Sequence, residues 1–205
     1  FFLHGFLENK SMWHQTVQRL PKKYRCIGLD LPGHGKSDNL GYVHSMDEMA
    51  EVVKALADFL KLRKIILVGH SMGGYVALAL AEKHPDLIKA VVLLNSSARA
   101  DSPEKKHNRD RAISLVKTHA KRYVRNAIPL LFRPKNRVAL RHKVRAVKEQ
   151  ALATSKQGII AALEGMKNRP DREVLLHFGA FPCFVIAGKH DPVIPLELIH
   201  EQVSY

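Results

Sequence analysis

The sequence predicts an α/β domain with a doubly wound, mostly parallel sheet and an inserted helical cap. Short apolar runs typical of buried strands alternate with segments whose apolar residues recur at helical spacing. Between residues 98 and 177 this alternation stops, and helical patterns follow one another without a strand. We therefore expect residues 1–97 and 178–205 to form an incomplete core and residues 98–177 to form the cap.

In the first half of the chain, expected strands and helices alternate. The strands cover residues 1–3, 25–30, 64–68 and 90–94, and the helices cover residues 12–20, 45–60 and 75–84. Ser45 and Glu48 form a capping box that starts the second helix. The run Lys64–Val68 is continuously apolar after its first residue, which is typical of a parallel strand covered on both faces.

The second half is expected to hold the cap helices and one more strand. The cap helices cover residues 111–119, 121–131, 136–153 and 157–166, the strand covers residues 181–187, and a helix begins at Pro195. The chain begins without Met inside an expected strand and stops at Tyr205 inside an expected helix. We therefore expect a longer parent chain at both ends.

The positive charge of the chain is concentrated in one segment. The formal net charge is +14, and Arg99–Arg172 contains 20 of the 33 Lys and Arg residues but only 6 of the 19 Asp and Glu residues. A neutral body with a basic cap is not the pattern of a nucleic-acid-binding domain. No run approaches the roughly 20 apolar residues of a membrane-spanning helix. Cys26 and Cys183 lie far apart in apolar runs, which favours free thiols and a cytoplasmic location.

The strongest functional signal is the motif Gly69–Gly74, which has the pattern G-x-S-x-G. It lies between an apolar strand and a helical pattern, and this is the setting in which a nucleophilic serine is held on a sharp turn. Side chains at Gly69 and Gly73 would collide with the neighbouring strand and helix. The turn aims the free N–H groups of the helix start at an oxyanion formed beside Ser71.

Four blocks of the chain resemble the α/β-hydrolase superfamily, in its cap-bearing branch of esterases, lactonases and haloperoxidase-like proteins. In chain order they are His4–Phe6, Asp30–Ser37, Gly69–Gly74 and Gly188–Pro195. The cap resembles this branch only in its position and helical character. The resemblance implies the α/β-hydrolase fold and a hydrolase that acts through an acyl-enzyme, with no cofactor and no metal.

The resemblance also implies roles for individual residues. Ser71 is the nucleophile, and the backbone N–H groups of Phe6 and Met72 form the oxyanion hole. Asp191 follows the last expected strand and is the acid that orients a catalytic histidine; an aspartate that only shapes a turn is the alternative. Asp101, after the preceding strand, is a weaker candidate for the acid.

The catalytic histidine is not expected among the 12 histidines of this chain. The superfamily places it after the acid, with a further strand between, and His200 lies on the helix that directly follows Asp191. His70 adjoins Ser71 inside the motif, so its side chain should point elsewhere. We therefore expect the histidine beyond Tyr205, and only weak hydrolysis by residues 1–205.

Five further residues are candidates for the substrate pocket. Met12 and Trp13 follow the expected oxyanion loop and either line the acyl pocket or pack in the core. Arg137, Arg141 and Arg145 share one face of a cap helix, where they either bind an anionic substrate or form a solvated surface. The sequence contains no cluster with metal-ligand spacing and no phosphate-binding glycine loop.

The expected substrate is a small carboxylic ester, thioester or lactone, and nothing in the sequence identifies its acid or alcohol part. Two alternatives stay open. A lyase or carbon–carbon hydrolase would use the same triad, whereas a non-catalytic hydrolase-like protein or an inactive fragment would keep the fold without the reaction. The sequence does not indicate an oligomeric state.

Overall fold

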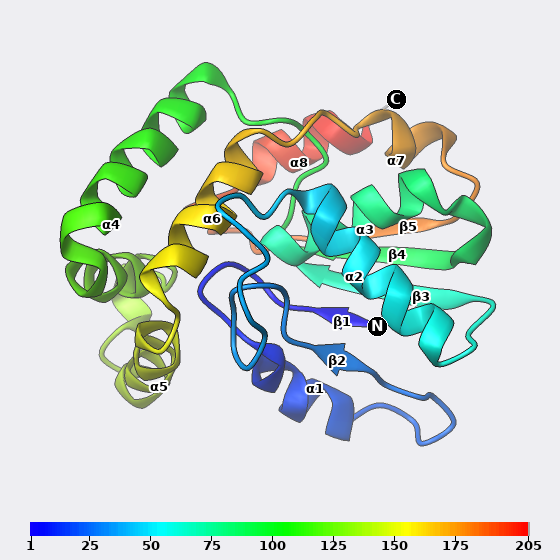
Figure 1. The fold of residues 1–205 in the computed structure, drawn as a ribbon, viewed down its shortest axis with the longest axis horizontal. Helices are drawn as coiled ribbons and strands as arrows, with labels where there is room; N and C mark the ends of the chain where they lie inside the picture. The colour runs from blue at the N-terminus through cyan, green and yellow to red at the C-terminus, as the bar shows by residue number, and fades with distance from the viewer. Residues whose placement is uncertain (205) are drawn as a thin grey trace.

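Five parallel strands form one sheet in the computed structural model, which describes residues 1–204 (Figure 1). The strands are β1 (Phe2–Leu3), β2 (Gly28–Leu29), β3 (Ile65–His70), β4 (Ile88–Leu94) and β5 (Cys183–Ile186). Their order across the sheet is β2-β1-β3-β4-β5. The chain adds β2 on one side of β1 and the later strands on the other, so the expected doubly wound sheet is confirmed.

The helices match most of the expected ones, with shifted ends. They are α1 (His14–Gln18), α2 (Met46–Phe59), α3 (Met72–Lys83), α4 (Pro103–Leu130), α5 (Arg141–Leu152), α6 (Lys156–Lys167), α7 (Val174–Phe178) and α8 (Leu196–Val203). The capping box at the start of α2 is present. The Ser45 hydroxyl accepts a hydrogen bond from the Glu48 N–H, and the Glu48 carboxylate accepts one from the Ser45 N–H.

Four expected elements have other boundaries. Only Gly28–Leu29 of the strand expected over residues 25–30 pairs with β1, because β2 is an edge strand with one neighbour. Two expected cap helices are joined in α4, which breaks at His119, where φ is −137° and ψ is 51°. The helix expected over residues 136–153 begins only at Arg141, after a short 3-10 helix over Pro134–Asn136.

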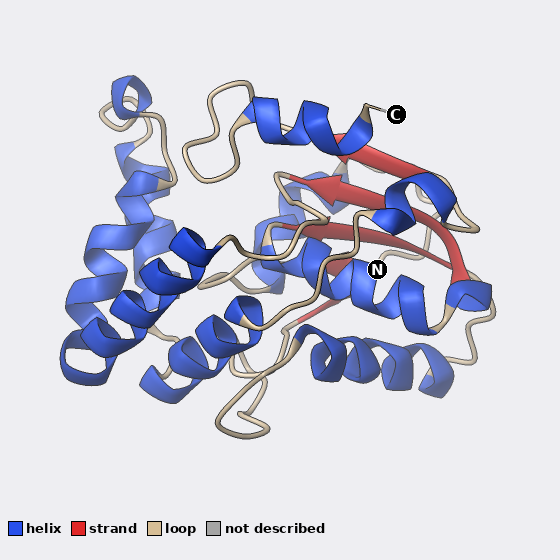
Figure 2. Ribbon diagram, turned by 90° about the horizontal axis from the view of Figure 1, so that it is seen from above, coloured by secondary structure: helices blue, strands red, loops and turns tan. Residues whose placement is uncertain are grey.

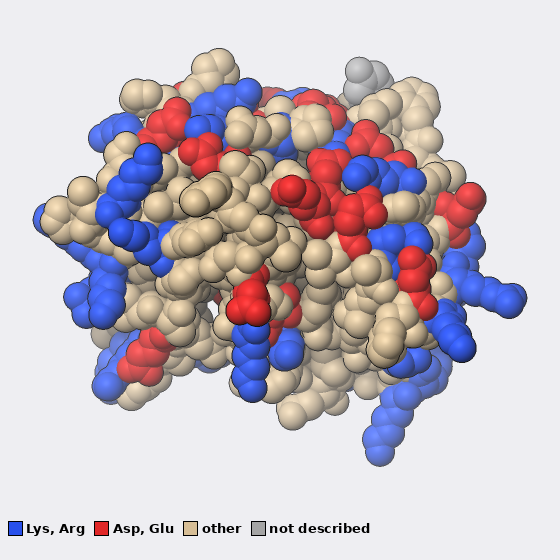
Figure 3. Space-filling view, in the orientation of Figure 1, with Lys and Arg blue, Asp and Glu red and all other residues tan. Residues whose placement is uncertain are grey.

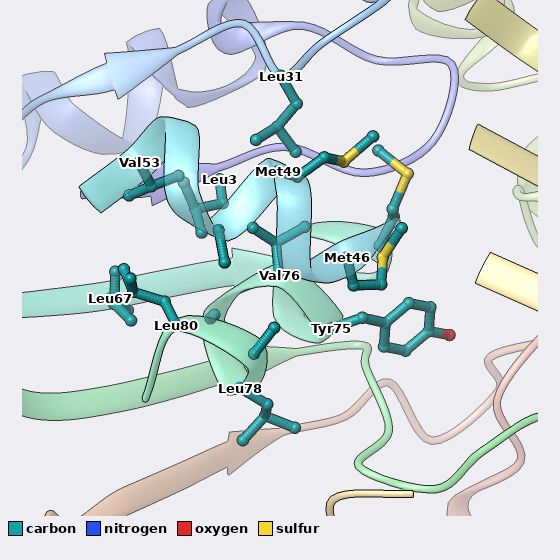
Figure 4. Packing of buried hydrophobic residues seen from close by; sticks show 14 of the residues in the cluster. Leu3, Leu31, Met46, Met49, Val53, Leu67, Tyr75, Val76, Leu78 and Leu80 are labelled. Atoms are coloured by element: carbon teal, nitrogen blue, oxygen red, sulfur yellow. The ribbon is translucent and has the colours of Figure 1, made fainter. Parts of the chain in front are cut away.

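The main core lies between the sheet and the pair α2 and α3, which share one face of the sheet (Figure 2). Met49 and Val53 of α2, Val76 of α3 and Leu67 of β3 are fully buried and lie close together in Figure 4. Burying each of these side chains contributes roughly 1.5–3 kcal/mol. The ring of Tyr75 points out of this cluster toward α6, so α3 is fixed in the core while its first turn faces the cap.

The opposite face of the sheet is less covered than the continuous apolar runs predict. In register across three strands, Val68 lies beside Val92 and Phe184, and Phe184 is 59% exposed. Ile66 and Ile186 on the same face are 37% and 54% exposed. The expectation of a strand covered on both faces is therefore wrong for β3 within residues 1–204, because helices cover this face only in part.

The cap lies beyond one end of the sheet and is formed by α4, α5 and α6 (Figure 1). The helix α6 rests directly on the core. A Cβ atom at Gly158 would overlap the carbonyl group of Gly33, and one at Gly165 would overlap that of His44. The His44 N–H also donates a hydrogen bond to the Ala161 carbonyl group at 3.0 Å. These close approaches hold the cap over the carboxyl ends of the strands.

The expected cap segment of residues 98–177 includes one helix that lies elsewhere. The helix α7 contacts α8 and lies away from the cap helices (Figure 1). The helices α4, α5 and α6, between Pro103 and Lys167, lie within the expected cap segment, whose bounds stay a prediction.

Candidate active site

Ser71 lies on the sharp turn between β3 and α3. Its φ of 49° and ψ of −115° are unusual for a residue with a side chain. The Ser71 N–H donates a hydrogen bond to the Leu94 carbonyl group at 3.0 Å, and the Ser96 hydroxyl donates one to the Ser71 carbonyl group at 2.8 Å. The neighbouring strand β4 therefore holds the strained turn, and such strain is concentrated at functional sites.

The two motif glycines allow the close approach that this turn requires. A Cβ atom at Gly69 would overlap the backbone of Gly73 in α3, and one at Gly73 would overlap the carbonyl group of Leu3 in β1. The collisions with helix and strand that the sequence predicts are thus confirmed.

A cavity of about 620 Å³ lies between the cap and the carboxyl ends of the strands, and both Ser71 and Asp191 line it. The cap contributes one wall, which is largely apolar and is formed by Tyr123, Ala127, Ile128, Leu131, Phe132 and Val147. An apolar cavity with a few convergent polar groups is the usual form of a small-molecule site.

The loop after β1 carries the expected oxyanion donor and is anchored by a buried histidine. His4 donates from Nδ1 to the Gly5 carbonyl group at 2.8 Å and accepts at Nε2 from the Leu31 N–H at 2.9 Å. Burial lowers the pKa of His4, which favours the neutral ring that this bonding needs. Phe6 lines the cavity, and Met72 is the first residue of α3, where a backbone N–H has no partner within the helix.

Asp191 is held by hydrogen bonds to both of its carboxylate oxygens. Oδ1 accepts from the N–H groups of Val193 and Ile194 at 2.7 and 3.0 Å, and Oδ2 accepts from the side-chain amide of Asn95. The bonds to Oδ1 are those of a turn-forming aspartate. The carboxylate nevertheless lines the same cavity as Ser71, so the turn orients it toward the site.

Asp101, the weaker candidate for the acid, has another set of partners. Its side chain is 1% exposed and is paired with Arg109 and with Arg169, whose Nη1 lies 2.7 Å from Asp101 Oδ1. Although burial by itself raises the pKa of a carboxyl group, the two arginines hold the pKa of Asp101 below its usual value. Arg169 also lies over the ring of Tyr75, 3.9 Å from its centroid. This buried ion pair joins the cap to the core.

Glu8 and His70 form a pair in the cavity that the sequence analysis did not predict. Glu8 Oε2 accepts a hydrogen bond from the Gly5 N–H at 2.7 Å and lies 2.8 Å from His70 Nδ1. Burial by itself lowers the pKa of His70, but the hydrogen bond and charge of Glu8, together with the charge of Asp191, raise it above its usual value. One carboxylate thus joins the oxyanion loop to the nucleophile turn.

Replacement of this carboxylate by an amide, Glu8→Gln, should remove a pH-dependent part of the stability. Because the pKa of His70 is raised in the folded protein, the pair stabilises the fold fully below the usual histidine pKa of about 6.5. This contribution is lost as the pH rises through the folded-state pKa. The Tm difference between wild type and Glu8→Gln should therefore be larger at about pH 5.5 than at about pH 8.5.

A matched control for this measurement is Glu51→Gln. Glu51 lies 3.0 Å from Lys83 Nζ and 3.4 Å from His84 Nε2 and does not line the cavity, so the variant removes a carboxylate that pairs with a histidine and a lysine outside the site. Equal Tm differences for Glu8→Gln at the two pH values would show that His70 does not depend on the Glu8 charge.

Met12 and Trp13, the candidates for the acyl pocket, do not line the cavity that contains Ser71. Trp13 is 4% exposed, and its ring centroid lies 5.2 Å from that of Phe2. Met12 is half-buried in the short 3-10 helix over Lys10–Trp13. Of the two alternatives for these residues, the structure favours packing.

The three cap arginines do not line the cavity either. The Arg145 side chain is 81% exposed and forms an ion pair within its own helix. Arg137 donates from Nε to the Phe132 carbonyl group at 3.0 Å, and Arg141 is exposed. Of the two alternatives for these residues, the exposure of Arg141 and Arg145 favours a solvated surface, and Val147 of α5 lines the cavity instead. On the face drawn in Figure 3, Lys and Arg accordingly lie along the outer edge of the cap.

The described part of the chain, residues 1–204, contains no group of three or more His, Cys, Asp or Glu side chains placed to hold a metal ion. None of its helices has the length and apolar character needed to cross a membrane.

A family model described as "alpha/beta hydrolase fold" matches residues 1–202. Among solved structures, an esterase from Thermogutta terrifontis, described as malate bound, is similar with a TM-score of 0.92 and 33% identity, and the match covers 98% of this chain and 75% of that chain. The enol-lactonase from Burkholderia xenovorans is similar with a TM-score of 0.88 and 26% identity, over 98% of this chain and 76% of that chain.

A curated relative matches a shorter part of the chain. The AB hydrolase superfamily protein YisY of Bacillus subtilis is 39% identical over 101 residues, which are 48% of this chain and 38% of that protein. The chain spans little more than a third of the length of the first curated relatives that it matches.

Proposed function

Because this chain belongs to the alpha/beta hydrolase family, we propose that it is a serine hydrolase that cleaves a small carboxylic ester, thioester or lactone through an acyl-enzyme. The observation that carries the proposal is the strained Ser71, on the wall of a cavity that Asp191 also lines. The relatives support the class of reaction, since one is described as an esterase and another as an enol-lactonase.

In the proposed reaction, Ser71 Oγ attacks the substrate carbonyl carbon while a histidine removes its proton. The N–H groups of Phe6 and Met72 bind the resulting oxyanion, and one such donor typically accounts for a factor of 10²–10³ in rate. The histidine then protonates the leaving alcohol, thiol or ring oxygen, and water attacks the acyl-enzyme by the same route. Asp191 orients the imidazole and stabilises its positive charge.

The substrate class can be tested with the full-length protein and a panel of p-nitrophenyl esters, a lactone and a β-diketone. Hydrolysis of an ester or lactone that is lost in Ser71→Ala supports the proposal. Cleavage of the diketone without ester hydrolysis would identify a lyase or carbon–carbon hydrolase. No turnover of any of them would indicate a non-catalytic protein.

We propose that the histidine base lies beyond Tyr205. Of the two histidines that line the cavity, His70 is bonded at Nδ1 to Glu8, and the hydrogen bond and charge of Glu8 raise the pKa of His70 and so favour the charged ring, which cannot accept a proton. The other, His190, is an exposed residue of the turn that contains Asp191. Residues 1–205 should therefore hydrolyse p-nitrophenyl acetate far more slowly than the full-length protein. Equal rates would show that a histidine within residues 1–205 is the base.

We also propose that the protein works in a reducing compartment such as the cytoplasm. Cys26 and Cys183 are both free thiols, and burial raises the pKa of Cys183 to about 11. A thiol with so high a pKa is poorly reactive toward disulfides. Fractionation of the producing cells, followed by detection of the protein, tests this location.

A further inference from the structure

A second cavity of about 700 Å³ lies next to the one that contains Ser71. The two share four lining residues, Tyr75, Arg109, Tyr123 and Val193. The second cavity extends from them to the first turns of α4 and to α8. The two cavities are therefore adjacent, and the rings of Tyr75 and Tyr123 lie at their common boundary.

Most charged groups around the second cavity already have partners. Arg99 pairs with Glu173 and Glu201, and Arg109 pairs with Asp101. Lys105 and the exposed Glu104 are the exceptions. Within residues 1–204 the ammonium group of Lys105 makes no hydrogen bond and no ion pair, although the residue lines the cavity and is half-buried.

The surroundings of Lys105 are unfavourable for an unpaired cation. Burial is the largest cause that lowers its pKa below the usual value, and the positive charges of Arg169 and Arg109 lower it further. The charges of Asp101 and Glu104 oppose this effect without cancelling it. An anion bound in the cavity would supply the missing partner, and a carboxylate can accept the ammonium hydrogen bonds.

We propose that the second cavity is a subsite for a carboxylate at the far end of the substrate's acyl chain, with Lys105 as its counter-ion. The inference rests on the proposed ester hydrolysis, and it names the substrate class as half-esters of dicarboxylic acids. The carboxylate belongs to the acyl part because that part stays attached to Ser71 through both chemical steps. Anchoring its far end holds the ester carbonyl group near Ser71 in each step.

The test compares two chromogenic substrates on the full-length protein, p-nitrophenyl hydrogen adipate and its methyl ester. Wild type should prefer the charged substrate in kcat/KM, and the preference should fall with added NaCl. Lys105→Met should lower kcat/KM for the charged substrate by about tenfold or more, the size of one hydrogen bond to a charged group, while the neutral substrate changes little.

Two control variants locate the effect. Lys106→Met changes the neighbouring exposed lysine, which does not line either cavity, and should alter neither rate. Arg133→Met removes a cation that lines the first cavity and has no ion pair within residues 1–204. Loss of the charged-substrate preference in Arg133→Met but not in Lys105→Met would place the anion in the first cavity and overturn the inference.

The remaining outcomes separate the subsite from the proposed function. Equal rates on both substrates in wild type, or an equal loss on both in Lys105→Met, would refute the carboxylate subsite while leaving ester hydrolysis intact. An absence of hydrolysis of either substrate by wild type would refute the proposed function itself.

Discussion

The full-length protein should react covalently with a fluorophosphonate at Ser71, and Ser71→Ala should abolish both labelling and ester hydrolysis. Loss of the nucleophile of a serine triad lowers turnover by a factor on the order of 10⁶. The strained backbone of Ser71 does not depend on its hydroxyl group, so the variant should keep the fold and the Tm of wild type. Mass spectrometry of the labelled peptide and a p-nitrophenyl ester assay measure the two effects.

Ser96 provides a matched control for this experiment. It is a buried serine that donates a hydrogen bond to the Ser71 carbonyl group, and it does not line the cavity. Ser96→Ala should therefore lower the Tm and should still be labelled at Ser71. Labelling that persists in Ser71→Ala, on any other serine, would refute the assignment of the nucleophile.

The parts of the site that could be predicted from the sequence are those that local backbone geometry determines. A serine between two glycines, after an apolar run and before a helix, has few ways to fold, and the strained φ of Ser71 is what that setting requires. The doubly wound parallel sheet and the helical segment that interrupts it could be predicted for a similar reason. Alternation of buried strands with helices admits few topologies, and its interruption marks an insertion.

Contacts between distant residues could not be predicted in this way. Glu8 and His70 are 62 positions apart, and neither belongs to a local pattern that identifies its partner. The same holds for Lys105, because its lack of a partner depends on which acids Arg99 and Arg109 bind. Such pairings depend on how the cap and the loops pack, and helical periodicity carries no information about them.

The three cap arginines show a second limit on what can be predicted from the sequence. Helical spacing predicts that Arg137, Arg141 and Arg145 share one face, but Arg137 precedes α5 in the structure. The spacing also does not say which side of the helix faces the core. The apolar neighbour Val147 lines the cavity instead, as burial of apolar surface favours. A concentration of positive charge in the cap therefore predicts a basic surface more reliably than a basic site.

Asp191→Asn should lower kcat by a factor of about 10⁴ and leave KM nearly unchanged. A decrease in kcat of this size is expected when the acid of a triad is replaced by its amide, because the histidine is then held in the wrong tautomer. Asparagine can still accept at Oδ1 from the N–H groups of Val193 and Ile194, so the turn should survive. The Tm of the variant, measured beside kcat, checks that the fold is kept.

The paired variant Asp101→Asn distinguishes the two candidate acids. Asp101 is buried and carries the charge that offsets Arg109 and Arg169, so its loss should cost several kcal/mol of stability. Its effect on kcat, measured below the lowered Tm, should be small, because Asp101 does not line the cavity that contains Ser71. The opposite result would be a loss of activity by a factor of about 10⁴ in the folded Asp101→Asn protein and no such loss in Asp191→Asn. It would show that Asp101, which follows β4, is the acid of the triad and that Asp191 only shapes its turn.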